Sequence, residues 1–367
     1  MTTTKTTKKL IPLFTGIILF LLIITAMTLH IFSYLNRPRP LNIGIVPAMG
    51  GLGDRGFNDE AFAGVISAQL TYAFNFDVAD IKTEEDVLSS LTEMSESRDY
   101  DLIIAFSSLP ETVEALNIMS LNYPLQHYSH IDSTLDLPNV SGVQSRFEEQ
   151  AFLTGVIAGL GTIHPELPLS NPNYNAIGII LGQQTDVLDH ARVGYTAGAK
   201  YVNPDVTVIT TVLDSFLDIE GSIVAAHKMY EMDGVDFIQS FAGGLGQHIH
   251  GVARTLGRYS FGSGINSNHI QPNHVVATAS RDVGALVYNE ISQLINDTWS
   301  PGLHLLGLRE GAVGLERDFS NVVLPDDIET ALVLITGRLL KGELSVPKTD
   351  EALSAWLQTN QFTQPDL

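Results

Sequence analysis

Residues 50–64, GGLGDRGFNDEAFAG, combine closely spaced glycines with carboxylates and an aromatic side chain. The part GLGDRG has the G-x-G-x-x-G spacing that brings backbone N–H groups against a pyrophosphate in dinucleotide-binding proteins. Asp54, Asp59 and Glu60 crowd the same segment, and their charges would repel two phosphates. Acids at this position favour the start of a helix. A capped helix start is therefore the simplest interpretation, and a dinucleotide cofactor is the poorest.

A second glycine-rich stretch, AGGLGQHIHG, contains Gly243 and Gly244. Such glycines form a tight strand-to-helix turn and also let backbone N–H groups approach a ligand. His248 and His250 are two residues apart, so they do not share a helix face as a metal pair would. The sequence has no G-x-S-x-G elbow, H-E-x-x-H helix or Walker loop. We therefore expect neither an enzyme nor a metal site.

The segments that position these residues alternate between strand-like apolar runs and helix-like amphipathic runs. DLIIAFSS, residues 101–108, is a short apolar run of the kind found in buried parallel strands. The alternation predicts an α/β fold with parallel sheets covered on both faces. It restarts after the loop TIHPELPLSNPNYN, so two halves joined near residues 142–146 should face each other across a cleft.

Ligands of such sheets bind beyond the carboxyl ends of the strands. Five loops are expected to point into the cleft on this rule: 50–58, 107–111, 182–186, 243–247 and 266–269. The expected lobes are residues 41–143 with about 272–302, and about 144–271 with 303–345. Residues 346–367 are expected to form a C-terminal tail.

The N-terminal segment determines the expected location of the protein. Residues 10–35 contain no acid, lysine or arginine, which favours an uncleaved transmembrane anchor over a long cleaved signal. Residues 1–9 form a lysine-bearing stub and residues 36–40 a proline-containing linker, so the bulk is expected outside the cell membrane. The net charge of −21 disfavours nucleic acid as a partner, and the absence of cysteine excludes disulfides and a lipidated cysteine.

Five segments resemble, in the same order, the basic membrane protein (BMP) family of extracytoplasmic solute-binding proteins. They are GLGDRGFNDEAFAG, DLPNVSGVQSRFEEQAFLTGVIAG, GYTAGAKYVNPDVTV, GVDFIQSFAGGLGQ and GLREGAVGL. The resemblance covers about residues 41–344. It implies a type I periplasmic-binding-protein fold with two lobes and a hinge. It also implies a small-molecule ligand, often a purine nucleoside, and an ABC transporter permease or another membrane protein as the partner.

The resemblance also implies which residues contact the solute. In the first lobe these are Phe57 and Asn58, with Asp54 and Ser107 beside them, and in the second lobe Phe241, Gly243, Gly244 and Asn266. Arg281 is a further candidate, for a carbonyl or anionic group of the solute. The sequence departs from the family pattern at GINSN, where asparagines replace two acids, and at Arg281, which replaces a lysine. We therefore expect a small polar solute, a nucleoside or a related compound, with no cofactor. The alternative is a membrane-anchored sensor or regulator of the same fold.

Overall fold

The computed structural model describes residues 39–54, 56–107 and 109–363. The chain divides into two compact units, residues 1–41 and 42–367, and the second unit contains both sheets. The expected stub and anchor lie outside the described residues. Within the described ranges, no helix has the length and apolar character needed to cross a membrane.

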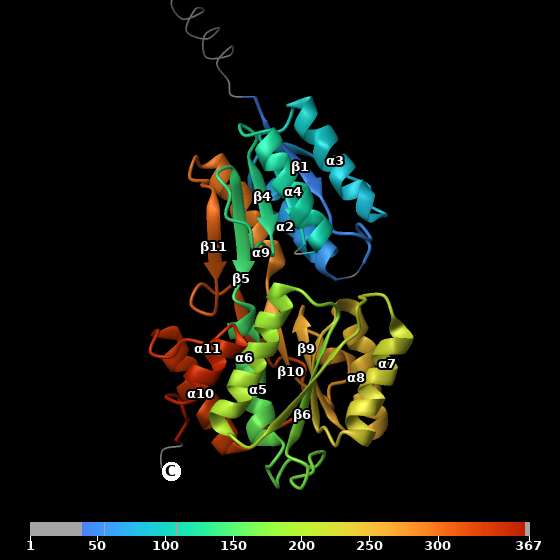
Figure 1. Cartoon of the computed structure of the whole chain (residues 1–367), viewed down its shortest axis with the longest axis vertical. Coiled ribbons are helices and arrows are strands. Elements are labelled where there is room, and N and C mark those ends of the chain that lie inside the picture. Colours follow the sequence, from blue (N-terminus) through green and yellow to red (C-terminus); the bar gives the residue numbers. More distant parts are fainter. Residues whose placement is uncertain (1–38, 55, 108, 364–367) are drawn as a thin grey trace, which may run out of the picture. The chain divides into compact units, whose positions relative to one another are not determined.

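The first lobe is built on a six-stranded sheet with the order β11-β5-β4-β3-β1-β2 in the described residues. β3 shows why the apolar runs form its centre, since all five residues of LIIAF are buried and hydrogen bonded in parallel to β1 and β4. Helices α2 and α9 lie side by side in Figure 1, and α2 has a glycine, Gly64, at its contact with Gly284. The elements are β1 (Leu41–Val46), α2 (Phe57–Thr71), β2 (Phe74–Val78), α3 (Glu84–Ser97), β3 (Leu102–Phe106), α4 (Pro110–Asn122), β4 (Tyr128–Ile131), β5 (Val140–Ser145), α9 (Val283–Ile295) and β11 (Gly302–Leu306).

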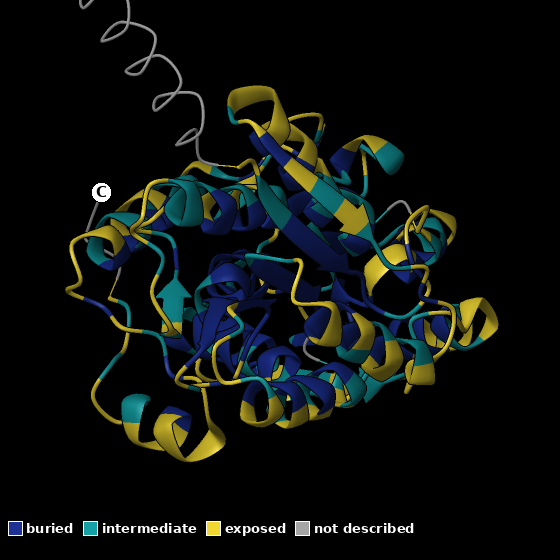
Figure 2. Cartoon of the chain, turned by 90° about the horizontal axis from the view of Figure 1, so that it is seen from above, coloured by how far each residue is buried: buried dark blue, intermediate teal, exposed yellow. Residues whose placement is uncertain are grey.

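The second lobe has a six-stranded sheet with the order β12-β10-β9-β8-β6-β7 in the described residues. Its strands pair in parallel except for β12, which runs antiparallel to β10 at the edge. Its elements are α5 (Phe147–Gly161), β6 (Ala176–Leu181), α6 (Asp186–Val202), β7 (Thr207–Val212), α7 (Ile219–His227), β8 (Phe237–Phe241), α8 (Gly246–Leu256), β9 (Tyr259–Gly264), β10 (Val275–Arg281), β12 (Val313–Glu316), α10 (Asp326–Leu340) and α11 (Asp350–Trp356). Figure 2 shows the buried residues gathered on the strands and on the helix faces turned toward them.

Glycines allow the close contact between α5 and α6. A Cβ atom added at Gly194 or Gly198 would fall inside contact distance of the carbonyl oxygens of Glu148 and Phe152, respectively. Thirteen of the fifteen residues of α5 are buried, so this helix is the centre of the second lobe. The backbones of α5 and α6 therefore approach more closely than residues with a Cβ would permit at these positions.

The chain passes between the two sheets three times within the described residues, after β5, after β10 and after β11. β10 belongs to the second sheet and β11 to the first, whereas the sequence analysis placed residues 272–302 in the first lobe and 303–345 in the second. Those two boundaries are wrong for these strands. The alternation of strands and helices shows where a strand lies but does not show which sheet provides its hydrogen-bonding neighbour.

The described part of the expected C-terminal tail, residues 346–363, packs on the second lobe. Trp356 of α11 contacts the rings of Phe152 and Tyr201. Phe362 lies against Tyr201, and its N–H donates to the Tyr201 carbonyl oxygen at 2.9 Å. Two aromatic side chains supply the apolar area that orders this segment.

Candidate functional site

The loop between β1 and α2 is held by the side chains of Asn58 and Asp54. The Asn58 Oδ1 accepts from the Ala48 N–H at 2.8 Å, and its Nδ2 donates to the Gly51 carbonyl at 2.9 Å. The Asp54 carboxylate accepts from the N–H groups of Gly56 and Asn58. These bonds use the polar atoms of both side chains within the loop, so each organises the loop that the sequence analysis assigned to the solute.

The glycine N–H groups of this loop also have partners. Gly51 donates to the Ala48 carbonyl at 3.0 Å, and Gly53 donates to Asp59 at 2.7 Å. Gly56 donates to Asp54 at 2.9 Å. All three donors of the G-x-G-x-x-G spacing are thus engaged by oxygens of the loop and the helix start. This arrangement supports the interpretation as a capped helix start.

Ser107 and Phe57 lie at the carboxyl edge of the first sheet, directly beyond β3 and the β1–α2 loop. Ser107 has a φ of 95°, which is uncommon for a residue with a Cβ and marks a constrained turn. Its carbonyl oxygen is 2.6 Å from Nε2 of His130. Burial lowers the pKa of His130 to about 4, so this imidazole is neutral near pH 7. Phe57 packs its ring edge-on against Phe106, with the ring centroids 6.4 Å apart.

In the second lobe, Phe241, Gly243 and Gly244 form the turn from β8 to α8. Gly243 has a φ of 55°, a conformation that favours glycine. Apart from atoms of the adjoining backbone, no atom of the described residues lies within 4 Å of the position that a Cβ would take at Gly244, so this backbone is open to an approaching ligand. Phe241 is buried and packs against Phe147, with ring centroids 6.4 Å apart.

Asn266 and Asn268 hold the segment after β9 rather than presenting free amides. The Asn266 Nδ2 donates to the Asp318 carbonyl at 3.2 Å, and its Oδ1 accepts from the Asn268 N–H. The Asn268 side chain is fully buried and bonds to Glu316, Asp318 and Thr278. A carboxylate could not make the donor contacts to these carbonyls, which accounts for amides at both positions.

Arg281 connects the carboxyl edges of the two sheets. It ends β10 in the second lobe, and its guanidinium forms an ion pair with Asp132, which follows β4 in the first lobe. The guanidinium carbon lies 5.3 Å from the Phe57 ring centroid and 4.7 Å from that of Phe147. One aromatic ring from each lobe therefore flanks the cation, a favourable arrangement because the ring faces are electron-rich.

Glu60 adds a further carboxyl group to this region. Burial raises the pKa of Glu60, and the positive charge of Arg281 acts in the opposite direction. Its Oε1 accepts from the Val283 N–H at 3.0 Å, at the start of α9. Glu60 thus fastens α2 to α9 within the first lobe and leaves Asp132 as the ion-pair partner of Arg281.

Three of the expected residues lie together in the structure. Phe57 and Arg281 are in contact, and Phe241 joins them through Phe147. Asp132 and Phe147 were not among the expected residues. Both stand just beyond the carboxyl end of a parallel strand, so the rule that selected the five loops would also have selected them.

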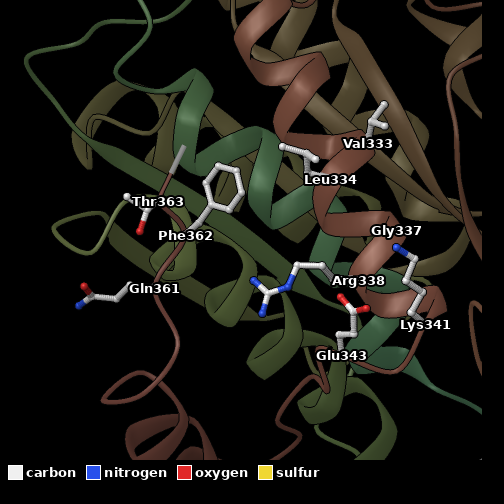
Figure 3. Close-up of a pocket in the computed structure, with 9 residues that line it drawn as sticks. All are labelled: Val333, Leu334, Gly337, Arg338, Lys341, Glu343, Gln361, Phe362 and Thr363. Atoms are coloured by element: carbon white, nitrogen blue, oxygen red, sulfur yellow. The ribbon is translucent and has the colours of Figure 1, made fainter. Parts of the chain in front are cut away.

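A surface hollow lies elsewhere, between α10 and the C-terminal segment (Figure 3). Its volume is about 550 Å³. Arg338 in this hollow bonds to the Tyr201 hydroxyl, so the guanidinium is already used to fix α10 to α6. The hollow contains none of the residues expected at the solute site. Its lining residues are Val333, Leu334, Gly337, Arg338, Lys341, Glu343, Gln361, Phe362 and Thr363.

Two α/β lobes joined by three crossings, with both carboxyl edges meeting at Arg281, define a periplasmic-binding-protein-like fold. A solute-binding protein of an ABC transporter from Aeropyrum pernix K1 shares this fold, with a TM-score of 0.74 and 21% identity, over 88% of this chain and 98% of that chain. The model of the family described as "ABC transporter substrate-binding protein PnrA-like" (Bmp) matches residues 43–349. The chain belongs to this family of ABC transporter substrate-binding proteins, which confirms the resemblance found in the sequence.

Curated relatives agree with this assignment. Basic membrane protein A of Borreliella afzelii is 28% identical over 317 residues, which cover 84% of this chain and 92% of the relative. Basic membrane protein B of Borreliella afzelii strain PKo is 34% identical over 250 residues, which cover 65% of this chain and 68% of the relative. The similarity to protein A therefore extends over nearly the whole of the described region.

Proposed function

We propose that the two lobes capture a nucleoside or a related small polar compound between their carboxyl edges and present it to an ABC transporter permease. The observation that carries the proposal is the meeting of Phe57 and Asp132 from one lobe with Phe147 and Arg281 from the other. A solute at this point contacts both lobes at once. Capture is then a shift of the lobe equilibrium, driven by contacts that exist only when both lobes engage the solute.

The proposed solute contacts differ in kind between the two lobes. Phe57 offers a ring face for stacking on a base, and Ser107 lies on the same sheet edge. Gly243 and Gly244 offer backbone N–H groups, because the space beside Gly244 is open. Phe241 packs against Phe147 and thereby helps to fix the position of that ring. Asp54, Asn58 and Asn266 act on the solute through the loops that their side chains hold.

The proposal includes an extracytoplasmic location. In this proposal residues 10–35, which lie outside the described residues, serve as a single-pass anchor that holds the remainder of the chain outside the cell membrane. A variant lacking residues 10–35 is expected to leave the membrane fraction, whereas the full chain resists alkaline extraction. Recovery from cells expressing the full sequence of a soluble product that lacks the N-terminal segment would show a cleaved signal instead. Solute binding without any associated permease would favour the sensor role.

Thermal unfolding of the full chain in detergent tests the solute class directly. The probes are adenosine, guanosine, inosine and their free bases, with NAD as the competing interpretation. A nucleoside at 100 times its Kd should add about 2.7 kcal/mol to the free energy of unfolding. Stabilisation by NAD with none by the nucleosides or bases would overturn the proposal.

Two variants in helix α2 test whether the solute binds at Phe57. Phe57→Leu removes the ring at the lobe junction and is expected to reduce the nucleoside-dependent shift strongly. Phe62→Leu is the matched control, because Phe62 lies in the same helix and packs on Phe76 at a centroid distance of 5.8 Å. An equal loss of the shift in both variants would show that the effect comes from general damage to α2.

A further inference from the structure

Arg281 and Asp132 are placed where relative movement of the lobes would separate them. Arg281 is the last residue of β10, beside the second crossing, and Phe147 opens α5 beside the first crossing. Both therefore belong to the second lobe. Asp132 and Phe57 project from the carboxyl edge of the first lobe. The guanidinium thus has one aromatic neighbour within its own lobe and takes its second aromatic neighbour and its ion-pair partner from the other.

We propose that Arg281 is a latch that holds the lobes together without a solute, and that Asp132 positions it. The side chains of this pair are only 11% and 9% exposed, so water replaces little of the interaction. Opening the lobes would leave Arg281 against Phe147 alone and would leave Asp132 and Phe57 without their cation. The charge-assisted hydrogen bond to Asp132 and the contact with the Phe57 ring exist only while the two carboxyl edges meet, so the latch favours the closed arrangement.

The neighbouring carboxylates do not substitute for Asp132. Asp282 caps α9 by accepting from the Ala285 N–H at 2.7 Å. Glu60 accepts from the Val283 N–H at the same helix start. Glu60 interacts with the charge of Arg281 at longer range, and each of the two carboxylates has an oxygen that accepts from the start of α9 in the first lobe. The interlobe ion pair is therefore specific to Asp132.

The hinge itself is held by a different group of residues. The Arg146 N–H donates to the Leu306 carbonyl at 2.7 Å, and Glu149 accepts from the Leu308 N–H at 2.9 Å. These bonds tie the first and third crossings to each other. Loss of the latch is consequently expected to change how far the lobes open and to leave the crossings intact.

The latch sits on the ring that the proposed solute needs. Arg281 lies over Phe57, so a solute that stacks on this ring must displace the guanidinium or share the space beside it. The latch is argued from contacts within the chain and holds whether or not the solute is a nucleoside. Its test accordingly uses the protein without any solute.

Distance measurement between spin labels tests the latch, because the chain contains no cysteine. Lys82→Cys, which follows β2 in the first lobe, and Leu217→Cys, which follows β7 in the second, place labels beyond the two carboxyl edges, at residues that are 74% and 79% exposed. Pulsed electron paramagnetic resonance of the labelled full chain should show one short distance population. Arg281→Gln and Asp132→Asn should each shift the major population to a longer distance, and the double variant should add little. Distributions that match the parent in both single variants would overturn the latch.

A control and a rescue separate the latch from general stability. Arg192→Gln removes two ion pairs that lie within the second lobe, with Asp189 and Asp350, whose side chains are 34% and 67% exposed, and should leave the distance unchanged. In Arg281→Ala, ethylguanidinium should restore the short distance in a saturable manner, whereas sodium chloride at equal ionic strength should not. Equal effects of the two salts, or a longer distance in Arg192→Gln, would contradict the proposal.

Discussion

Replacing Asn58 by alanine tests whether this side chain serves the loop or the solute. The change removes the acceptor of the Ala48 N–H and the donor to the Gly51 carbonyl, bonds of 2.8 and 2.9 Å. Ala48 and Asn58 are both buried, so water does not readily replace the lost partners. An unsatisfied buried donor costs about 1–3 kcal/mol, and each lost hydrogen bond about 1 kcal/mol. The expected loss in the free energy of unfolding is therefore about 2–4 kcal/mol.

Urea unfolding of the full chain, followed by circular dichroism, measures this loss. Asn117→Ala is the matched control, because the Asn117 amide donates only to the Val113 carbonyl of its own helix α4. We expect that control to change the free energy of unfolding by less than about 0.5 kcal/mol. If Asn58→Ala keeps the stability of the parent but loses solute binding, the loop role is refuted and the amide belongs to the solute.

Two further predictions concern the glycines and the buried histidine. Gly198→Ala places a Cβ against the carbonyl oxygen of Phe152 and should lower the free energy of unfolding by about 1–3 kcal/mol. Gly251→Ala, in α8, places its Cβ where no described atom outside the helix's own backbone lies within 4 Å, and it should raise the free energy of unfolding by up to about 1 kcal/mol. Equal melting temperatures for the two variants would refute this packing. The pKa of His130 is lowered by burial to about 4 from 6.5, so the unfolded chain takes up its proton first. The contribution of His130 to stability should fall by about 3 kcal/mol between pH 6.5 and 4, and urea titrations should show a pH dependence in His130→Gln that differs from that of the parent by this amount.

The sequence allowed the fold class to be predicted, because parallel α/β folds have a strong local signature. A run such as LIIAF has the length and apolar character of a buried strand, and all its residues are buried. Local sequence patterns could not predict which lobe contains β10 and which contains β11. It depends on hydrogen-bond partners distant in the sequence, and both strands lie close to a crossing.

Sequence reasoning selected two residues that lie in contact, but it could not decide the use of each side chain. The rule for the carboxyl ends of strands selected the loop that ends at Phe57, the family resemblance selected Arg281, and the two side chains are in contact. The same rule could not decide whether the Asn58 amide bonds to a solute or to its own loop. That choice depends on the path of the loop, where Gly51 and Gly53 adopt φ values of 64° and 96° and bring their backbone toward the helix start.

The glycine spacing in this loop resembles that of a phosphate-binding loop because both loops bring negative charge to the start of a helix. The start of a helix presents N–H groups and a positive partial charge, which an anion can satisfy. In a dinucleotide-binding loop the anion comes from the cofactor. Here Asp54 accepts from Gly56 and Asn58, and Asp59 accepts from Gly53, so the chain supplies its own anions. A negatively charged ligand would have to displace these carboxylates while lying beside them. The loop is therefore suited to hold Phe57 in a fixed place, and the recognition of a solute depends on the ring and on the charges that surround Arg281.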